Sequence, residues 1–231
     1  MSVAAPPRLP EALTRFLNTT GRQGGECFTI GGIDWETYRQ ISDELTGRHL
    51  RITYEDGRLD LMTISGKHGN LCRLFVALIR AVAEEMNLPL RCFGDMTCDK
   101  KKALRGLEPD ECFYMQNESA VRLNDDIDLT VDPPPDLAVE IELSRARRDR
   151  LSVYAGVGVP EVWRYNGKRL TGHVLSKDGK SYVESNISRA FPKLQLADLQ
   201  RFVELRTQLD ETSLIRSFRE WARDLAKNSS G

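Results

Sequence analysis

One charged residue inside an apolar segment constrains this chain more than any other feature. Residues 137–143 read Leu-Ala-Val-Glu-Ile-Glu-Leu, and they follow the turn-forming residues 133–136. An apolar, β-branched run bounded by turn residues is typical of a strand that is buried on both faces. An ionised carboxylate is costly in such a strand unless a cation or hydrogen bonds compensate it. Glu140 therefore indicates a site, because some other group in the fold must neutralise its charge.

A second acid follows at Glu142, and residues two apart share one face of a strand. Two like charges on one buried face repel each other unless a cation or a basic side chain lies near them. The alternative is an edge strand whose polar face meets solvent or three basic residues, Arg145, Arg147 and Arg148. The pattern alone leaves both interpretations open.

Other candidate site residues are weaker when each is taken alone. Asp110 follows a proline and precedes an aromatic run, and Glu55 precedes an Asp-Gly turn, so each has the sequence of an ordinary turn acid. His68 stands near a helix start, where a cap or surface role is more common than a ligand role. Lys100 belongs to a basic run that is typical of a solvated loop. Only the joint pattern of these residues is informative.

The order of the expected elements predicts an α/β fold with a central mixed β-sheet flanked by helices. The expected elements are a helix after Asp34, a hairpin over 49–62, a helix over 68–87, two or three strands in 90–113, a buried strand over 137–143, a helix over 147–156, a type I′ hairpin at 166–167, a hairpin at 178–179, and one long or two shorter helices in 196–226.

The length of 231 residues suits one domain. We expect a flexible N-terminal arm over residues 1–27, with a short helix near Leu13. A single domain over 28–226 and a disordered tail over 227–231 complete the expected organisation.

Charge and cysteine content narrow the function classes. The chain carries 33 basic and 34 acidic residues, for a net charge of −1, so DNA binding must rest on local basic patches.

Five cysteines without a C-x-x-C pair argue against a zinc site or a disulfide framework, and favour free thiols in a reducing compartment. With no apolar segment long enough to span a bilayer and no signal-peptide pattern, we expect a cytoplasmic protein.

Several motifs together resemble the Uma-type family of restriction endonucleases, within the PD-(D/E)XK nuclease superfamily. The similarity covers about residues 35–203. The motifs that carry it are Tyr54-Glu55-x-Gly57, Pro109-Asp110, Pro135-Asp136-Leu137-x-Val139-Glu140 and Gly158-Val159-Pro160-Glu161-Val162-Trp163. The resemblance implies the restriction-endonuclease-like fold and a metal-dependent endonuclease that hydrolyses DNA.

The resemblance also implies roles for individual residues. Asp110 and Glu140 would bind Mg²⁺ or Mn²⁺, and Glu55 would be an additional upstream acid. Such ions prefer oxygen ligands and need only one or two protein carboxylates. Cleavage of both DNA strands would favour a two-fold homodimer.

Two departures from the family pattern bear on catalysis. Glu142 stands where the superfamily usually has a basic residue, and Arg150 stands where the Uma-type family tends to have a lysine. Arginine stays charged and can contact phosphate, but it does not readily serve as a general base. We therefore take Arg150 as a catalytic-site residue that binds the phosphate.

Arg145, Arg147, Arg148 and Lys100 are the expected contacts to the DNA backbone. The alternative is a catalytically impaired nuclease-fold module that binds nucleic acid or a protein partner. A metal-dependent hydrolase acting on nucleotides or small phosphoesters is a third interpretation.

Overall fold

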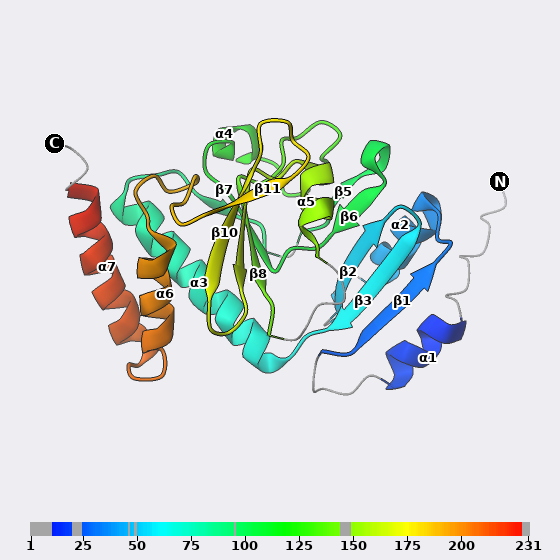
Figure 1. Ribbon diagram of the computed structural model, residues 1–231, viewed down its shortest axis with the longest axis horizontal. Helices are drawn as coiled ribbons and strands as arrows, with labels where there is room; N and C mark the ends of the chain where they lie inside the picture. Colours follow the sequence, from blue (N-terminus) through cyan, green and yellow to red (C-terminus); the bar gives the residue numbers. More distant parts are fainter. Residues whose placement is uncertain are drawn as a thin grey trace.

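The computed structural model describes residues 11–19, 25–45, 47–48, 50–94, 96–143 and 149–227. Its strands form two sheets, with helices packed around them (Figure 1). The helices are α1 (Glu11–Thr19), α2 (Trp35–Leu45), α3 (Gly66–Glu85), α4 (Glu118–Val121), α5 (Leu151–Val157), α6 (Leu196–Leu205) and α7 (Glu211–Lys227), with a 3-10 turn η1 (Lys101–Ala103).

The first sheet has the order β1-β3-β2-β6-β5, and all of its neighbours are antiparallel. Its strands are β1 (Cys27–Gly31), β2 (Leu50–Glu55), β3 (Arg58–Thr63), β5 (Cys98–Lys100) and β6 (Arg105–Leu107). The hairpin β2–β3 turns at Asp56 and Gly57, whose φ angles of 47° and 82° confirm the turn expected from the sequence.

Helix α2 covers one face of the first sheet. Asp34 accepts a hydrogen bond from the amide of Thr37 at 2.7 Å and caps the helix start, as expected. The rings of Tyr38 and Tyr54 stack at 4.5 Å between the helix and the sheet. A Cβ atom on Gly106 would lie 2.2 Å from the Tyr38 hydroxyl, so glycine is required where β6 passes this pair. The expected helix near Leu13 is α1, and Leu13 is buried in the same core.

The second sheet has the order β11-β10-β9-β8-β7-β4 and is mixed, because β8 and β9 are parallel while the other neighbours are antiparallel. Its strands are β4 (Arg91–Cys92), β7 (Glu111–Tyr114), β8 (Leu137–Ile141), β9 (Glu161–Tyr165), β10 (Leu170–Leu175) and β11 (Tyr182–Ser185). Every residue of β8 is buried, which confirms the predicted buried strand.

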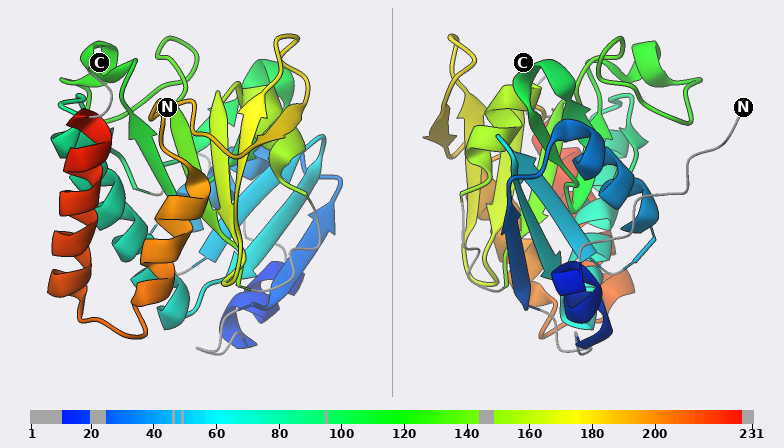
Figure 2. Two further views of the ribbon diagram at one scale, coloured as in Figure 1. Left: turned by 60° about the vertical axis from the view of Figure 1, so that its left-hand side comes forward. Right: turned by 90° about the vertical axis from the view of Figure 1, so that its right-hand side faces the viewer.

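Helices flank the second sheet as the element order predicted. Helices α3, α6 and α7 pack on one face, where they share a core with β7 to β10 (Figures 1 and 2). The short helix α5 packs on the other side and contacts β2, β5 and β6 of the first sheet. Helix α5 therefore joins the two sheets, and it brings its own side chains to the place where they meet.

Residues 196–226 form two helices, one of the two arrangements expected from the sequence. The structure corrects two other details. Residues 90–113 contain four short strands rather than two or three. The hairpin at 166–167 is present, but only Gly167 has a positive φ, so the type I′ assignment was wrong. The Asn166 Oδ1 atom instead accepts hydrogen bonds from the backbone amides of Lys168 and Arg169, and these bonds close a longer loop between β9 and β10.

The position of β8 settles the edge-strand alternative. It lies between β7 and β9, so it is not an edge, and that interpretation was wrong. Glu142 follows the end of β8 and pairs with Arg164 of β9 through contacts of 2.9 and 3.0 Å. The Glu142 charge is therefore compensated separately from that of Glu140. Parts of the expected N-terminal arm and C-terminal tail, 1–10, 20–24 and 228–231, lie outside the described residues.

Candidate active site

Two predicted site residues, Asp110 and Glu140, lie opposite each other at the start of β7. In the antiparallel register Glu111 pairs with Val139, and one further step places Asp110 beside Glu140. The Asp110 Oδ2 atom accepts a hydrogen bond of 2.5 Å from the amide of Ile141, which fixes the carboxylate against β8. The structure thus brings together the two acids that sequence motifs singled out.

Arg51 of β2 bridges these two carboxylates from the other sheet. Its guanidinium forms an ion pair with Asp110 Oδ1, and its Nη1 atom lies 3.4 Å from Glu140 Oε2. Arg51, Asp110 and Glu140 are 7%, 5% and 2% exposed, so solvent does not screen these charges. Arg51 therefore provides a positive charge where a cation shared by both carboxylates would lie.

Helix α5 and Arg150, the N-cap residue before it, supply two more partners for Glu140. Arg150 donates from Nη1 to Glu140 Oε2 at 2.6 Å and from Nη2 to the Glu108 carbonyl at 2.7 Å. The Tyr154 hydroxyl donates to Glu140 Oε1. Glu140 is thus held by two guanidinium groups and a phenol, which explains how its charge is tolerated inside the sheet.

The protonation states of these partners follow from burial and charge. Burial lowers the pKa of Arg51, although Glu140 opposes the shift. Burial acts in the same direction on Arg150, but the attraction of Glu140 leaves the Arg150 pKa above its ordinary value. Burial raises the pKa of Tyr154 well above its ordinary value, and the Glu140 charge adds to that rise. Tyr154 is therefore a neutral hydrogen-bond donor.

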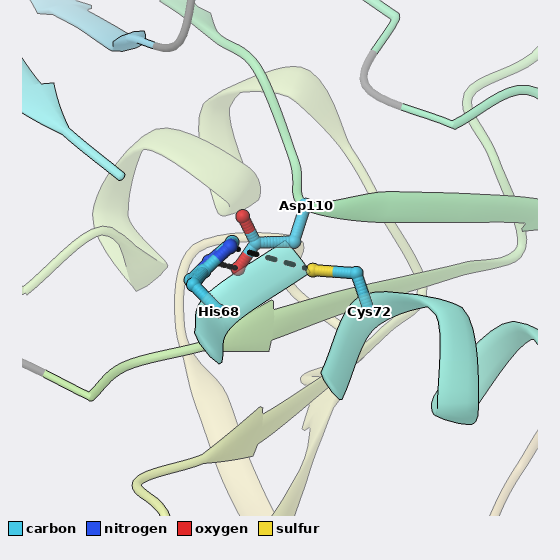
Figure 3. A group of neighbouring side chains, drawn as sticks. All are labelled: His68, Cys72 and Asp110. Atoms are coloured by element: carbon cyan, nitrogen blue, oxygen red, sulfur yellow. Dashed lines mark hydrogen bonds and ion pairs between the residues drawn. The ribbon is translucent and has the colours of Figure 1, made fainter. Parts of the chain in front are cut away.

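Asp110 also meets His68 from the first turn of α3, and His68 in turn contacts Cys72 (Figure 3). His68 Nε2 lies 2.9 Å from Asp110 Oδ2, and the Cys72 Sγ atom lies 3.5 Å from His68 Nδ1. Burial, followed by the charges of Arg51 and Arg150, lowers the His68 pKa to about 4. Burial raises the pKa of Cys72 to about 12. At neutral pH the imidazole is therefore uncharged and the thiol protonated.

Glu55 takes a different position. It lies on the same face of β2 as Arg51, but four residues along the strand, which corresponds to about 13 Å. Arg105 Nε lies 3.1 Å from Glu55 Oε1 and provides a counter-charge. The structure therefore places Glu55 along β2 from the Asp110–Glu140 pair rather than within it.

The predicted DNA-contacting residues are described only in part. Lys100 is half-buried on β5, an edge strand, opposite Arg105. Arg145, Arg147 and Arg148 lie outside the described residues. A role of these basic residues at a DNA backbone stays a prediction.

The comparison with protein families decides the relationship that the motifs indicated. Residues 35–225 match the family model Uma2, whose description is "Putative restriction endonuclease". The chain belongs to the Uma2 family. This family lies in the restriction-endonuclease-like PD-(D/E)XK superfamily, so the resemblance and the predicted fold are confirmed. A search of curated proteins gave no match. In the described part of this Uma2 chain, none of the helices has the length and apolar character needed to cross a bilayer.

Nucleases of the PD-(D/E)XK superfamily generally use divalent metals, so the fit of the carboxylate pair to such an ion matters. Asp110 and Glu140 are hard oxygen donors that converge on one cation position. That position is held by Arg51, and Arg150 brings the formal charge of the four groups to zero. The pair therefore fits a divalent ion once the Arg51 guanidinium withdraws.

Sequence reasoning missed two residues of this Uma2 site, Arg51 and Cys72, and it favoured a cap or surface role for His68. Arg51 alternates with the apolar residues Ile52 and Tyr54 along β2, which in the sequence is the pattern of a solvent-facing position, although the structure buries it. His68 and Cys72 stand four residues apart in the helix that the sequence predicted best, and so on one face. The sequence could not show that this face meets Asp110.

Proposed function

We propose that this Uma2 protein is a metal-dependent endonuclease that hydrolyses phosphodiester bonds in DNA. One observation carries the proposal: Asp110 and Glu140 lie opposite each other, and both contact the same cationic group, Arg51. Two acids with a shared cation are what a phosphodiesterase of this superfamily needs. The family match over residues 35–225 supports the same reaction.

The acids would hold Mg²⁺ or Mn²⁺, which when bound lowers the pKa of its water and neutralises charge on phosphate. Arg51 is the group that must leave, and a phosphate is a suitable new partner because guanidinium binds it in bidentate geometry. The DNA would thus bring the negative charge that releases Arg51 from Asp110 and Glu140. In this account Arg51 exchanges a carboxylate for a phosphate.

Tyr154 would hold Glu140 in place during that exchange, while Arg150 would turn from Glu140 to the phosphate. Arg150 keeps an anchor at the Glu108 carbonyl, so its second nitrogen can turn to a phosphate oxygen while the side chain stays fixed. Arginine does not take up a proton at neutral pH, and neither does the neutral Tyr154. Both residues are therefore assigned to binding and positioning rather than to proton transfer.

Residues outside this cluster complete the proposal. Glu55 would be an additional acid near the DNA, and Arg145, Arg147, Arg148 and Lys100 would track its backbone. Two copies related by a two-fold axis would cut both strands.

Cleavage of supercoiled plasmid with Mn²⁺ or Mg²⁺ tests this function. Wild type should nick the plasmid only when metal is present, and Glu140→Gln should lose the activity. Glu142→Gln is the matched control, because Glu142 pairs with Arg164 outside the cluster. Loss of cleavage in both variants, or persistence in Glu140→Gln, would contradict the assigned site.

The second candidate is a nuclease-fold module that binds nucleic acid or a protein partner without hydrolysis. It is favoured by the full compensation of the acid pair by Arg51 and Arg150. In that case wild type would bind DNA with a steep salt dependence but cut nothing with any metal. If the protein neither binds nor cuts DNA, the protein-partner form of this candidate would remain.

A further inference from the structure

A second donor set adjoins the acid pair on the α3 side. His68, Cys72 and Asp110 each present one ligand atom, and these atoms lie within 4.8 Å of one another (Figure 3). All three residues are buried. We propose that His68, Cys72 and Asp110 form a binding site for a thiophilic divalent cation of the Zn²⁺ or Co²⁺ class.

The local structure holds these donors in place. His68 and Cys72 stand one helical turn apart on α3, a 20-residue helix whose start is capped by Ser65. The amide of Ile141 fixes the Asp110 carboxylate. Tetrahedral zinc with bonds of roughly 2.0–2.3 Å has ligand atoms about 3.3–3.8 Å apart. The separation of 3.5 Å between Cys72 Sγ and His68 Nδ1 meets that requirement. Asp110 Oδ2 faces the other ring nitrogen, Nε2, at 2.9 Å, so the carboxylate or the imidazole must shift to bring all three ligand atoms from within 4.8 Å to the tetrahedral spacing.

The donor chemistry selects the class of ion. A thiolate and an imidazole favour zinc and cobalt, whereas Mg²⁺ takes oxygen ligands. With three protein ligands, a tetrahedral ion has one further position for water or an anionic oxygen. Such a composition differs from the all-carboxylate pair formed by Asp110 and Glu140.

Charge favours this site over the acid pair while Arg51 stays in place. The two carboxylates and the guanidinium groups of Arg51 and Arg150 sum to zero. A divalent ion between the acids would add two positive charges to this buried cluster unless Arg51 left. An ion bound by Cys72 as a thiolate adds only one, because metal binding releases the thiol proton. The thiophilic ion can therefore bind without displacing Arg51.

This cation site shares Asp110 with the proposed nuclease site, but binding there requires neither DNA nor hydrolysis. A protein that cuts no DNA could still bind cobalt here. A nuclease that uses only Mg²⁺ could lack this site. The two claims therefore fail separately.

Titration of the full-length protein with Co²⁺ tests the site, because a thiolate ligand gives cobalt a charge-transfer absorption in the near ultraviolet. Wild type should show this band at one equivalent, and excess Mg²⁺ should not remove it. Cys72→Ser should abolish the band. His68→Gln should weaken cobalt binding at least about tenfold, because losing a direct ligand should cost no less than losing an outer-shell partner.

Cys27→Ser is the matched control, because Cys27 lies on β1 in the first sheet, and it should keep the band. Absence of the band in wild type, or its persistence in Cys72→Ser, would overturn the proposal. Should Cys72→Ser fail to fold by circular dichroism, His68→Gln decides. Unchanged cobalt affinity in that variant would also overturn it.

Discussion

Arg51 and Glu140 belong to different sheets, and Arg51 Nη1 lies 3.4 Å from Glu140 Oε2 in a region that solvent does not reach. The same guanidinium pairs with Asp110. A buried arginine thus links β2 of the first sheet to β7 and β8 of the second. The link has a consequence for stability and another for metal binding.

Arg51→Met should destabilise the protein by about 3–5 kcal/mol, because removing one partner leaves buried carboxylates uncompensated. Urea unfolding measures this cost. Arg58→Met is the control, since Arg58 forms a partly exposed pair with Asp60 and should cost at most about 1 kcal/mol. Equal costs for the two variants would show that the Arg51 bridge contributes no more than a surface pair.

Tyr154→Phe should lower the free energy of unfolding by about 1.5–3 kcal/mol, the range for a hydrogen bond to a charged group. The lost bond is the one from the Tyr154 hydroxyl to Glu140. Tyr165 is equally buried, but its hydroxyl has no hydrogen-bond partner among the described residues. Tyr165→Phe should therefore be neutral or stabilising, and a similar cost for both changes would contradict the assigned contact.

His68 should make stability depend on pH. Its pKa is about 4 in the folded chain and 6.5 in an unfolded one, so the unfolded chain binds more protons between these values. Stability should therefore fall as the pH falls from about 6.5 to about 4.

Urea unfolding at several pH values tests this dependence. His68→Gln should remove most of the slope in that window, whereas His173→Gln, at a half-buried position on β10, should keep most of it. A slope that persists in His68→Gln would assign the dependence to other groups.

Arg150→Lys should raise metal-dependent plasmid cleavage roughly tenfold or more, because a lysine can exchange a proton and general acid–base catalysis contributes at least that much. Nicking rates at saturating Mn²⁺ measure the change. Arg164→Lys, at the separate pair with Glu142, should leave the rate unchanged. A rate below that of wild type would mean that Arg150 acts through its two simultaneous hydrogen bonds, to Glu140 and to the Glu108 carbonyl.

Much of the fold could be predicted because local signals agreed with the tertiary structure. The Asp-Gly turn of β2–β3, the apolar periodicity of α3 and the apolar run of β8 are each specified by nearby residues. The division of strands between two sheets was not predicted. That division depends on pairing between β2 and β6, which are about fifty residues apart, and no local pattern encodes it.

The candidate site was predicted to a similar extent. Asp110 and Glu140 stand in motifs, so the sequence could identify them. Arg51, His68 and Cys72 come from other elements, and their relevance arises only where those elements meet. Glu55 was grouped with the acids by motif order, and in the structure it stands four residues along β2 from Arg51 and pairs with Arg105.

Binding of Mn²⁺ to wild type and to Arg51→Met, followed through the spin resonance of free Mn²⁺, tests most directly whether Asp110 and Glu140 form a cation site. Removing the competing guanidinium should tighten Mn²⁺ binding at least about tenfold, or roughly 1.4 kcal/mol. Adding Glu140→Gln to Arg51→Met should abolish the gain. Equal Mn²⁺ affinity in wild type and Arg51→Met would contradict the assignment of the acid pair as a metal site.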